Sequence, residues 1–306
     1  MKKVTYLIAA FCATSFAGLA QSQNNEVFIK QLVGANQADV QQGASEGFAR
    51  DNVAEVYQQG DDNLGNIFQG VRTSTALSNI ATLKQQGDDN IGEIFQGDDF
   101  SETIANEATL TQTGETNEGR ISQGKTEGRA SQNIATLTQT GKGNNNSEIA
   151  QGTLDGRALV STANLTQAGD HNEGDIFQGL RSGISVENEA TLTQTGDGNF
   201  AQIGQGIWDG IAEENTATLT QVGEGNSAVI IQGSNEAFAF DTNGALQRAS
   251  VNQAETAAER STATIDQHGD AHIASAVQIG SINDLIQIQQ SGHGSFARVA
   301  QGVTLP

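Results

Sequence analysis

The sequence predicts an all-β, amyloid-like protein: a two-sheet β-solenoid of about eleven strand–turn–strand rows, stacked parallel and in register. Three observations lead to this class. A unit of about 27 residues recurs along the chain, side chains alternate with a period of two inside it, and 36 Gly stand against one Pro and 5% aromatic residues among 306. Large apolar side chains are too few for a conventional core. The only Pro is the last residue, so every strand can pair on both sides.

The first 20 residues have the pattern of a secretory signal peptide. Lys2 and Lys3 precede an apolar stretch that ends in small residues at Ala20, and the stretch is too short to span a bilayer as a helix. We expect cleavage after Ala20, which leaves residues 21–24 as a short mature N-terminus. Cleavage also removes Cys12 and leaves 13 basic against 36 acidic residues, a net charge of −23. A secreted chain without cysteine cannot rely on disulfides.

A repeat anchored on a glutamine organises the mature chain. Successive anchors lie 26 to 28 residues apart as far as Gln247, and then 20 and 23 residues apart. We divide the chain into eight regular repeats over 25–233, three less regular repeats over 234–302 and a tail over 303–306. The anchors are Gln31, Gln58, Gln85, Gln112, Gln139, Gln167, Gln194, Gln221, Gln247, Gln267 and Gln290.

Three further polar columns keep their distance from the anchor, and in the row of Gln139 this requires one inserted residue within 144–146. Six residues before the anchor stand Asn25, Asn52, Asn79, Asn106, Asn133, Ser161, Asn188, Asn215, Asp241, Ser261 and Asp284. Five residues after it stand Asn36, Asn63, Asn90, Asn117, Asn172, Asn199, Asn226 and Asn252, then His272 and Ser295. A second glutamine follows at Gln42, Gln69, Gln96, Gln123, Gln151, Gln178, Gln205, Gln232, Gln278 and Gln301. The row of Gln247 lacks it.

Side chains between these columns alternate as they do in strands. Ala190, Leu192 and Gln194 fall on one face of their segment, and Thr191 and Thr193 fall on the other. A second alternating segment follows after a Gly-Asp-Gly turn signal. Each row therefore predicts two strands whose inward faces meet in a narrow interior of small, aliphatic and amide side chains.

The inward amides predict ladders along the stack. A buried amide without a partner costs about 1–3 kcal/mol. Rows stacked in register place each Gln or Asn about 4.7–4.8 Å from its copy, so that the amides bond to one another continuously. Low-complexity disorder is the alternative explanation of the Gln and Asn content, but the fixed spacing and the interleaved Leu and Ile argue against it.

The pattern resembles the curlin repeat, which runs Ser, five residues, Gln-x-Gly-x-x-Asn-x-Ala, three residues, Gln. Residues 215–232 read Asn, five residues, Gln-x-Gly-x-x-Asn-x-Ala, three residues, Gln, and the likeness covers nearly all of residues 25–302. Three features depart from the family: a longer period with extended row-to-row connections, Asn for the leading Ser, and Gly for Ala in several rows. The short mature N-terminus also leaves little room for an export-targeting segment.

The resemblance implies a structural subunit of an extracellular curli-like fibre on a Gram-negative bacterium, serving biofilm matrix and cell adhesion. Such a subunit polymerises with itself, and the resemblance implies two partners: an outer-membrane export channel and a nucleator subunit. Eight regular rows favour the major subunit of the fibre, and the nucleator is the alternative.

The turn after each anchor is acidic, with Asp61-Asp62, Asp88-Asp89, Glu115, Asp170, Asp197, Glu224 and Asp270. Stacked in register, these carboxylates repel one another until acid or cations relieve the repulsion. We interpret them as a guard against premature aggregation, and a Ca²⁺ site is the weaker alternative. Assembly is then expected to accelerate near pH 4 or with divalent cations.

A rival function follows from the outward threonines. Thr111, Thr138, Thr193 and Thr220 repeat on one outer face, as in an ice-binding β-solenoid. Lys84, Asn164 and Asp266 interrupt this face, and Thr is in any case a common exposed strand residue.

Other functions find little support. No Ser/His/Asp or Cys/His arrangement recurs, and the four His are too scattered for a metal site. We therefore predict no enzyme activity, no cofactor and no metal. The acidic composition argues against nucleic-acid binding, and no mature segment is apolar enough for a transmembrane helix.

Overall fold

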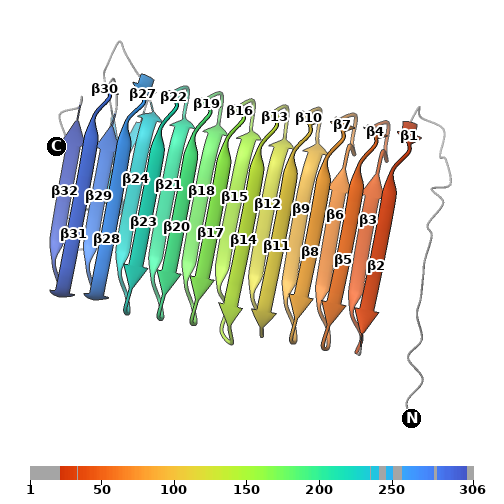
Figure 1. Cartoon of the computed structure of the whole chain (residues 1–306), viewed down its shortest axis with the longest axis horizontal. Helices are drawn as coiled ribbons and strands as arrows, with labels where there is room; N and C mark the ends of the chain where they lie inside the picture. Colours follow the sequence, from red (N-terminus) through yellow and green to blue (C-terminus); the bar gives the residue numbers. More distant parts are fainter. Residues whose placement is uncertain are drawn as a thin grey trace.

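A computed structural model describes residues 21–32, 34–234, 236–240, 246–250, 257–278 and 281–301. The predicted signal peptide, the tail, Asp241 and Asn252 lie outside these ranges. All elements within them are strands, so the all-β prediction is confirmed. Figure 1 shows the strands stacked side by side along one axis, from β1 at one end to β32 at the other.

Three parallel sheets build the solenoid, and in the described ranges each has ten strands. The anchor sheet, which carries the first glutamines, contains β2 (Glu26–Leu32), β5 (Val53–Gln59), β8 (Ile80–Gln86), β11 (Glu107–Gly114), β14 (Ile134–Gly141), β17 (Thr162–Ala168), β20 (Glu189–Thr195), β23 (Thr216–Val222), β28 (Thr262–Asp270) and β31 (Leu285–His293). The opposing sheet, which carries the second glutamines, contains β3 (Gln37–Gln42), β6 (Leu64–Gln69), β9 (Ile91–Asp98), β12 (Glu118–Lys125), β15 (Asn146–Thr153), β18 (Glu173–Leu180), β21 (Phe200–Ile207), β24 (Ser227–Ser234), β29 (Ile273–Gln278) and β32 (Phe296–Gln301).

The third, connecting sheet corrects the prediction of two sheets. Its short strands are β1 (Gln21–Gln23), β4 (Phe48–Arg50), β7 (Thr75–Leu77), β10 (Glu102–Ile104), β13 (Arg129–Ser131), β16 (Arg157–Leu159), β19 (Ile184–Val186), β22 (Ile211–Glu213), β27 (Ala257–Glu259) and β30 (Ser281–Ile282). They occupy the segments predicted as extended row-to-row connections. Three residues are too few to show a period, but they pair in register with the rungs on either side, as Arg129 does with Glu102 and Arg157.

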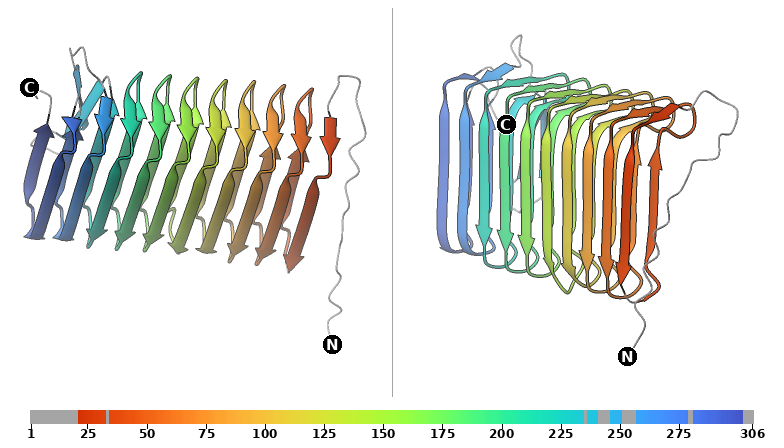
Figure 2. Two further views of the ribbon diagram at one scale, coloured as in Figure 1. Left: turned by 45° about the horizontal axis from the view of Figure 1, so that its top comes forward. Right: turned by 45° about the vertical axis from the view of Figure 1, so that its right-hand side comes forward.

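One strand from each sheet makes a rung, and rungs stack in strict register. Gln112 lies opposite Gln85 and Gln139 in the anchor sheet, and Gln123 lies opposite Gln96 and Gln151 in the opposing sheet. The predicted parallel, in-register β-solenoid is confirmed. Figure 2 shows that the repeated coils enclose a narrow interior between the long strands.

One predicted row does not join the stack. Residues around Gln247 form an antiparallel hairpin of β25 (Glu236–Phe240) and β26 (Leu246–Ser250), and β23 pairs directly with β28. The hairpin leaves the side of the stack in Figure 2. This row lacks the second Gln, so it cannot extend the opposing ladder, and the stack contains ten rungs where about eleven rows were predicted.

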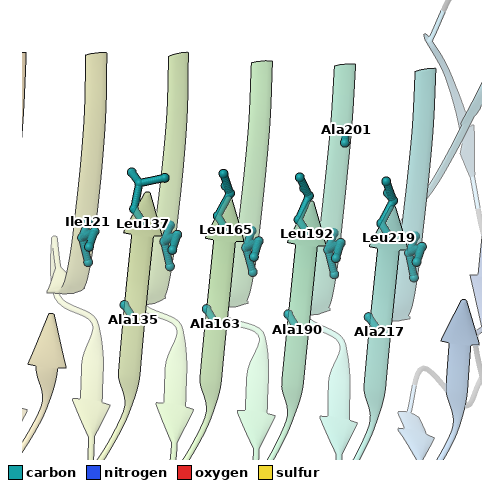
Figure 3. Close-up of a cluster of buried hydrophobic side chains, with 14 of the residues drawn as sticks. Ile121, Ala135, Leu137, Ala163, Leu165, Ala190, Leu192, Ala201, Ala217 and Leu219 are labelled. Atoms are coloured by element: carbon teal, nitrogen blue, oxygen red, sulfur yellow. The ribbon is translucent and has the colours of Figure 1, made fainter. Parts of the chain in front are cut away.

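The core is a file of small and aliphatic side chains between the anchor and opposing sheets. In the rungs from β8 to β23, one Ala and one Leu of the anchor sheet face an Ile of the opposing sheet, as Ala135, Leu137 and Ile149 do, all at 0% exposure. Figure 3 shows Leu137, Leu165, Leu192 and Leu219 in line along the stack. Burying each such Leu or Ile contributes about 1.5–3 kcal/mol.

Glycine is favoured just after the anchor, where successive rungs come close together. Gly196 has a φ of +106°, and a Cβ there would lie 2.2 Å from the carbonyl oxygen of Gly223 in the next rung. Two residues later, Gly198 has a φ of +65° and no heavy atom within 4 Å of a Cβ position. The first glycine is therefore imposed by stacking as well as by the backbone conformation, and the second by the backbone alone.

Candidate functional site: amide ladders and two open edges

The anchor glutamines form an unbroken ladder through the interior. Nine Nε2–H···Oε1 hydrogen bonds of 2.7 to 3.1 Å join successive side chains from Gln31 to Gln290. The ladder passes directly from Gln221 to Gln267, at 2.9 Å. Gln247 lies on β26 and takes no place in it.

The second glutamines form a parallel ladder. Nine hydrogen bonds of 2.7 to 3.0 Å join Gln42 to Gln301 through the opposing sheet. Its interior members, such as Gln123 and Gln205, are 0% exposed. Each link satisfies a buried donor and a buried acceptor, so removing one amide leaves its neighbours with an unmet cost of about 1–3 kcal/mol.

Both glutamine ladders have the same direction. Each Nε2 donates to the Oε1 of the next rung toward the C-terminus, as Gln58 does to Gln85 at 2.8 Å. The second Nε2 hydrogen points at main-chain carbonyls, which for Gln58 are those of Gln37 and Asn63 at 2.8 and 3.1 Å. Because carbonyl oxygens only accept hydrogen bonds, these contacts fix the orientation of the amide and hence the direction of the ladder.

The second Asn column forms a ladder of opposite direction. Asn63 Nδ2 donates to Asn36 Oδ1 of the preceding rung at 2.9 Å, and six further links continue the pattern to Asn226. Asn145 takes the ladder position in the row with the inserted residue. Beyond Asn226, the imidazole of His272 takes the place of the amide, and its Nδ1 accepts from the backbone N–H of Ser295 at 3.1 Å.

The leading Asn column forms a fourth ladder, which the predicted set of site residues lacks. Asn52 donates its backbone N–H to Asn25 Oδ1 at 2.9 Å and its Nδ2 to the carbonyl of Ala76 at 2.9 Å. The column stands where a connecting strand meets an anchor strand, so it ties these two sheets together. Its regular spacing from the anchor was the available signal. Asp284 occupies this position in the last rung.

The acidic turns accept hydrogen bonds from the neighbouring rung. The Oδ1 atoms of Asp88 and Asp197 lie 2.8 Å from the backbone nitrogens of Asp61 and Asp170, and Asp170 accepts in the same way from Lys142 at 2.7 Å. These carboxylates thus satisfy turn N–H groups that would otherwise point at solvent. Their proposed control of aggregation stays a prediction.

The outer face of the opposing sheet concentrates charge over the middle rungs. Arg120 pairs with Glu93 at 2.8 Å, and the next two rungs place Glu148 and Asp175 side by side in the same column. These side chains line a groove of about 280 Å³. Burial raises the pKa of Asp175 to about 7, and the Glu148 carboxylate adds to the shift.

The two ends of the solenoid are open sheet edges. β1, β2 and β3 end the three sheets on one side, and β30, β31 and β32 end them on the other. Each terminal strand has one neighbour, so its outward backbone N–H and C=O groups await a partner. Inward apolar side chains are also uncovered at the first edge, where Val27 is 39% exposed while its counterpart Ala54 is 0% exposed.

The described ranges contain neither a candidate metal site nor a candidate membrane-spanning helix. No three His, Cys, Asp or Glu side chains of these residues are arranged to hold a metal ion. No helix among the same residues is long and apolar enough to cross a membrane.

Comparison with known families gives one match. Residues 105–141 match the family model of the curlin associated repeat. This segment is similar to a curlin repeat. The matched segment runs from the leading Asn106 past one complete rung to the anchor Gln139, and the other nine rungs continue its register in all three sheets. This match supports a curli-type fibre subunit in general. No curated protein matches the chain.

Several rows have Gly at the position where the curlin pattern has Ala. A Cβ at Gly92 would lie 2.6 Å from Leu110 Cδ2 and 2.6 Å from Leu83 Cδ1. At Gly119 it would approach Leu110 Cδ1 to 2.8 Å. Methyl groups of the anchor-sheet Leu side chains are thus among the atoms nearest to these glycines, while other rungs of the same column hold Ala201 and Ala228.

Proposed function

We propose that this protein is the secreted major subunit of an extracellular curli-like amyloid fibre, serving biofilm matrix and adhesion on a Gram-negative bacterium. The observation that carries the proposal is that in-register amide ladders run through the stack and that the stack ends in two open sheet edges. A second copy stacked on either edge would extend all three sheets, and it would continue both glutamine ladders with the contacts that each rung already makes. Within the fold, no further covering element is needed for growth.

The interactions that hold rungs together inside one chain would also hold successive copies together in the fibre. Each new junction pairs three strands, covers the exposed inward side chains of a terminal rung and supplies partners for its amides. Parallel, in-register stacking at about 4.7–4.8 Å with side-chain amide ladders is the arrangement that makes amyloid stable. The acidic turns oppose contact between unassembled chains through repulsion between like charges.

The major-subunit assignment rests on the regularity of the first eight rungs, and the nucleator of the same fibre is the alternative. A nucleator starts fibres made of another chain, whereas a major subunit grows on its own seeds. Export through an outer-membrane channel and growth from a nucleator follow from the curlin resemblance and belong to this proposal.

The proposal is tested with the mature chain, residues 21–306, purified under denaturing conditions and diluted into buffer. We expect thioflavin-positive fibres whose strands lie perpendicular to the fibre axis, and growth on their own seeds without a lag. Gln194→Leu with Gln205→Leu interrupts both glutamine ladders, and we expect assembly about tenfold slower or more, because buried amides in two rungs lose partners. Thr193→Leu with Gln202→Leu makes comparable changes on the outer faces of the same strands and serves as the control. Equal rates for the two double variants would contradict the ladder account.

Ice binding is a second candidate because one threonine column is uninterrupted over five rungs. Thr111, Thr138, Thr166, Thr193 and Thr220 pair in register on the outer face of the anchor sheet. Lys84 and Asp266 occupy the two positions that bound the column. Thermal hysteresis that disappears in Thr138→Lys with Thr193→Lys would establish this function, and its absence in the wild-type chain would remove it.

A further inference from the structure

We propose that Arg298 on the last rung and Asp39 on the first rung form an ion pair between successive copies of this chain. With the direction of the amide ladders, this pair makes the C-terminal edge of one copy the specific docking surface for the N-terminal edge of the next. The inference rests on the proposed fibre function, and it names the residues that select the partner edge and its register.

The ladders make the two edges complementary. At the C-terminal edge, Gln290 and Gln301 direct Nε2 donors away from the preceding rung, while at the N-terminal edge Gln31 and Gln42 each have an Oε1 that accepts from no earlier rung in the described chain. Joining unlike edges continues both ladders. Joining like edges would place donors against donors or acceptors against acceptors, which leaves buried amides unpaired.

The spacing of the two edges also matches. From leading residue to anchor, Asn25 to Gln31 and Asp284 to Gln290 each span six positions, and from first to second glutamine both terminal rungs span eleven. Aligning Gln290 with Gln31 therefore aligns Gln301 with Gln42 without strain. It also sets the Asp284 carboxylate against the backbone N–H of Asn25, in the place where Asn25 Oδ1 accepts from the N–H of the following rung.

In the same alignment, apolar inward side chains of one copy contact apolar inward side chains of the next. Ile288 would cover Ile29, and Val299 would cover Val40, as each rung covers the next inside the chain. Within the stack, the columns of these residues form one apolar core. The junction thus continues the core as well as the ladders.

The charge pair arises in the outer column of the opposing sheet. Asp39 begins this column, Glu93 and Arg120 stand in its middle, and Arg298 ends it, because successive register pairs connect them through every rung. The alignment of Gln301 with Gln42 puts Arg298 opposite Asp39. Arg120 and Glu93 occupy two adjacent positions of the same column and pair at 2.8 Å. The fold therefore already holds an ion pair between adjacent positions of this column, with the acid on the earlier rung and the arginine on the later one.

The experiment uses charge exchange at the two edges of the mature chain. Arg298→Asp alone places two acids opposite one another at every junction, and Asp39→Arg alone places two arginines there, so each variant should elongate its own seeds about three- to tenfold more slowly than wild type. An equimolar mixture of the two variants regains an opposite-charge pair at every junction when they alternate. We expect the mixture to elongate at close to the wild-type rate, and the double variant to do the same. Lys84→Asp, on the outer face of the anchor sheet away from both edges, controls for net charge.

The outcomes separate this inference from the proposed function. Wild-type fibres with slow single variants and a rescued mixture support the pair. Wild-type fibres with single variants that elongate as fast as wild type, or with a mixture no faster than its components, overturn the pair and leave the fibre function standing. A wild-type chain that forms no fibres overturns the fibre function itself.

Discussion

The row of Gln221 and the row of Gln247 begin alike and end in different structures. Both have the anchor glutamine, but the first keeps the second Gln and the turn Gly and forms a full rung, whereas the second forms the antiparallel hairpin. The stack continues past the hairpin without a gap, because Gln221 donates a hydrogen bond directly to Gln267 at 2.9 Å. An anchor glutamine alone does not make a rung: every rung of the stack also keeps the second glutamine.

The segment that forms the hairpin lies against the outer face of the stack. Gln221 and Gln267 are 46 positions apart, 19 more than the usual 27. β25 contacts β24 and β29, and these are the strands whose outward side chains Val229, Ile231 and Val277 are buried in a second apolar cluster. In the regular rungs the corresponding outer positions are mostly polar or small. The hairpin and this apolar face therefore belong together.

The largest effect is expected from a methyl group at a glycine where two rungs come close together. Gly196→Ala places its Cβ 2.2 Å from the carbonyl oxygen of Gly223, which should destabilise the rung by about 3 kcal/mol or more and abolish seeded growth. Gly198→Ala, two residues away in open space, should cost only about 1 kcal/mol. Denaturation midpoints of the soluble chains and growth rates on wild-type seeds measure both. Similar losses in the two variants would show that rung contact is not what selects glycine.

A deletion tests whether the row of Gln247 is dispensable for stacking. Removing residues 236–254 and changing Glu255→Asp and Thr256→Gly restores a 27-residue row with an Asp-Gly turn. We expect fibres to form at a rate within about twofold of wild type, because both glutamine ladders already bypass this segment.

The same deletion should uncover the apolar face and increase lateral bundling of the fibres in electron micrographs. Val229→Thr with Ile231→Thr in the deleted chain should reverse the bundling. Loss of fibre formation in the deleted chain would show that the hairpin takes part in the stack.

The effect of pH on the stability of the middle rungs is expected to be smaller than the effects above. Asp175 has a pKa raised to about 7 by burial and by Glu148, above its value of about 4 in an unfolded chain. An acid whose folded pKa is raised is stabilising while protonated, so its contribution is present below about pH 4 and is lost as the pH rises toward 7.

Asp175→Asn should therefore raise the free energy of unfolding at pH 8 by about 1–2 kcal/mol after allowance for solvent screening, with little change at pH 4. Asp155→Asn, in an exposed turn of a neighbouring rung, is the control. A stability difference that is the same at both pH values would contradict the assignment.

The smallest expected effect concerns the backbone at the corner before the anchor strand. Val160 has a φ of +54° and Glu187, in the same column, has a φ of +52°. This conformation is costly for a β-branched residue and mild for Asn. Val160→Asn should stabilise the chain by about 1 kcal/mol, and Glu187→Asn by less. A shift of the denaturation midpoint in the opposite direction for Val160→Asn would contradict this account of the corner.

The anchor and opposing strands and the inward Gln and Asn columns were predictable because each repeats with a period and alternates along its strand. The connecting sheet was not, since its strands have three residues. The sequence does contain a signal for it: Ala76, Thr103 and Ala130 stand 18 positions after Gln58, Gln85 and Gln112, and all three are buried. The register of Asn145 and the burial of Asp175 depend on neighbouring rungs, which no single row reveals.

Electron cryo-microscopy of fibres grown from the purified mature chain tests the central claim most directly. The account predicts one continuous parallel stack at about 4.8 Å per rung, in which ten rungs of one copy are followed by β2 and β3 of the next against β31 and β32. The glutamine ladders would cross that boundary unbroken from Gln290 to Gln31. Fibres built from antiparallel strands, or from solenoids joined side by side with their edges unpaired, would contradict it.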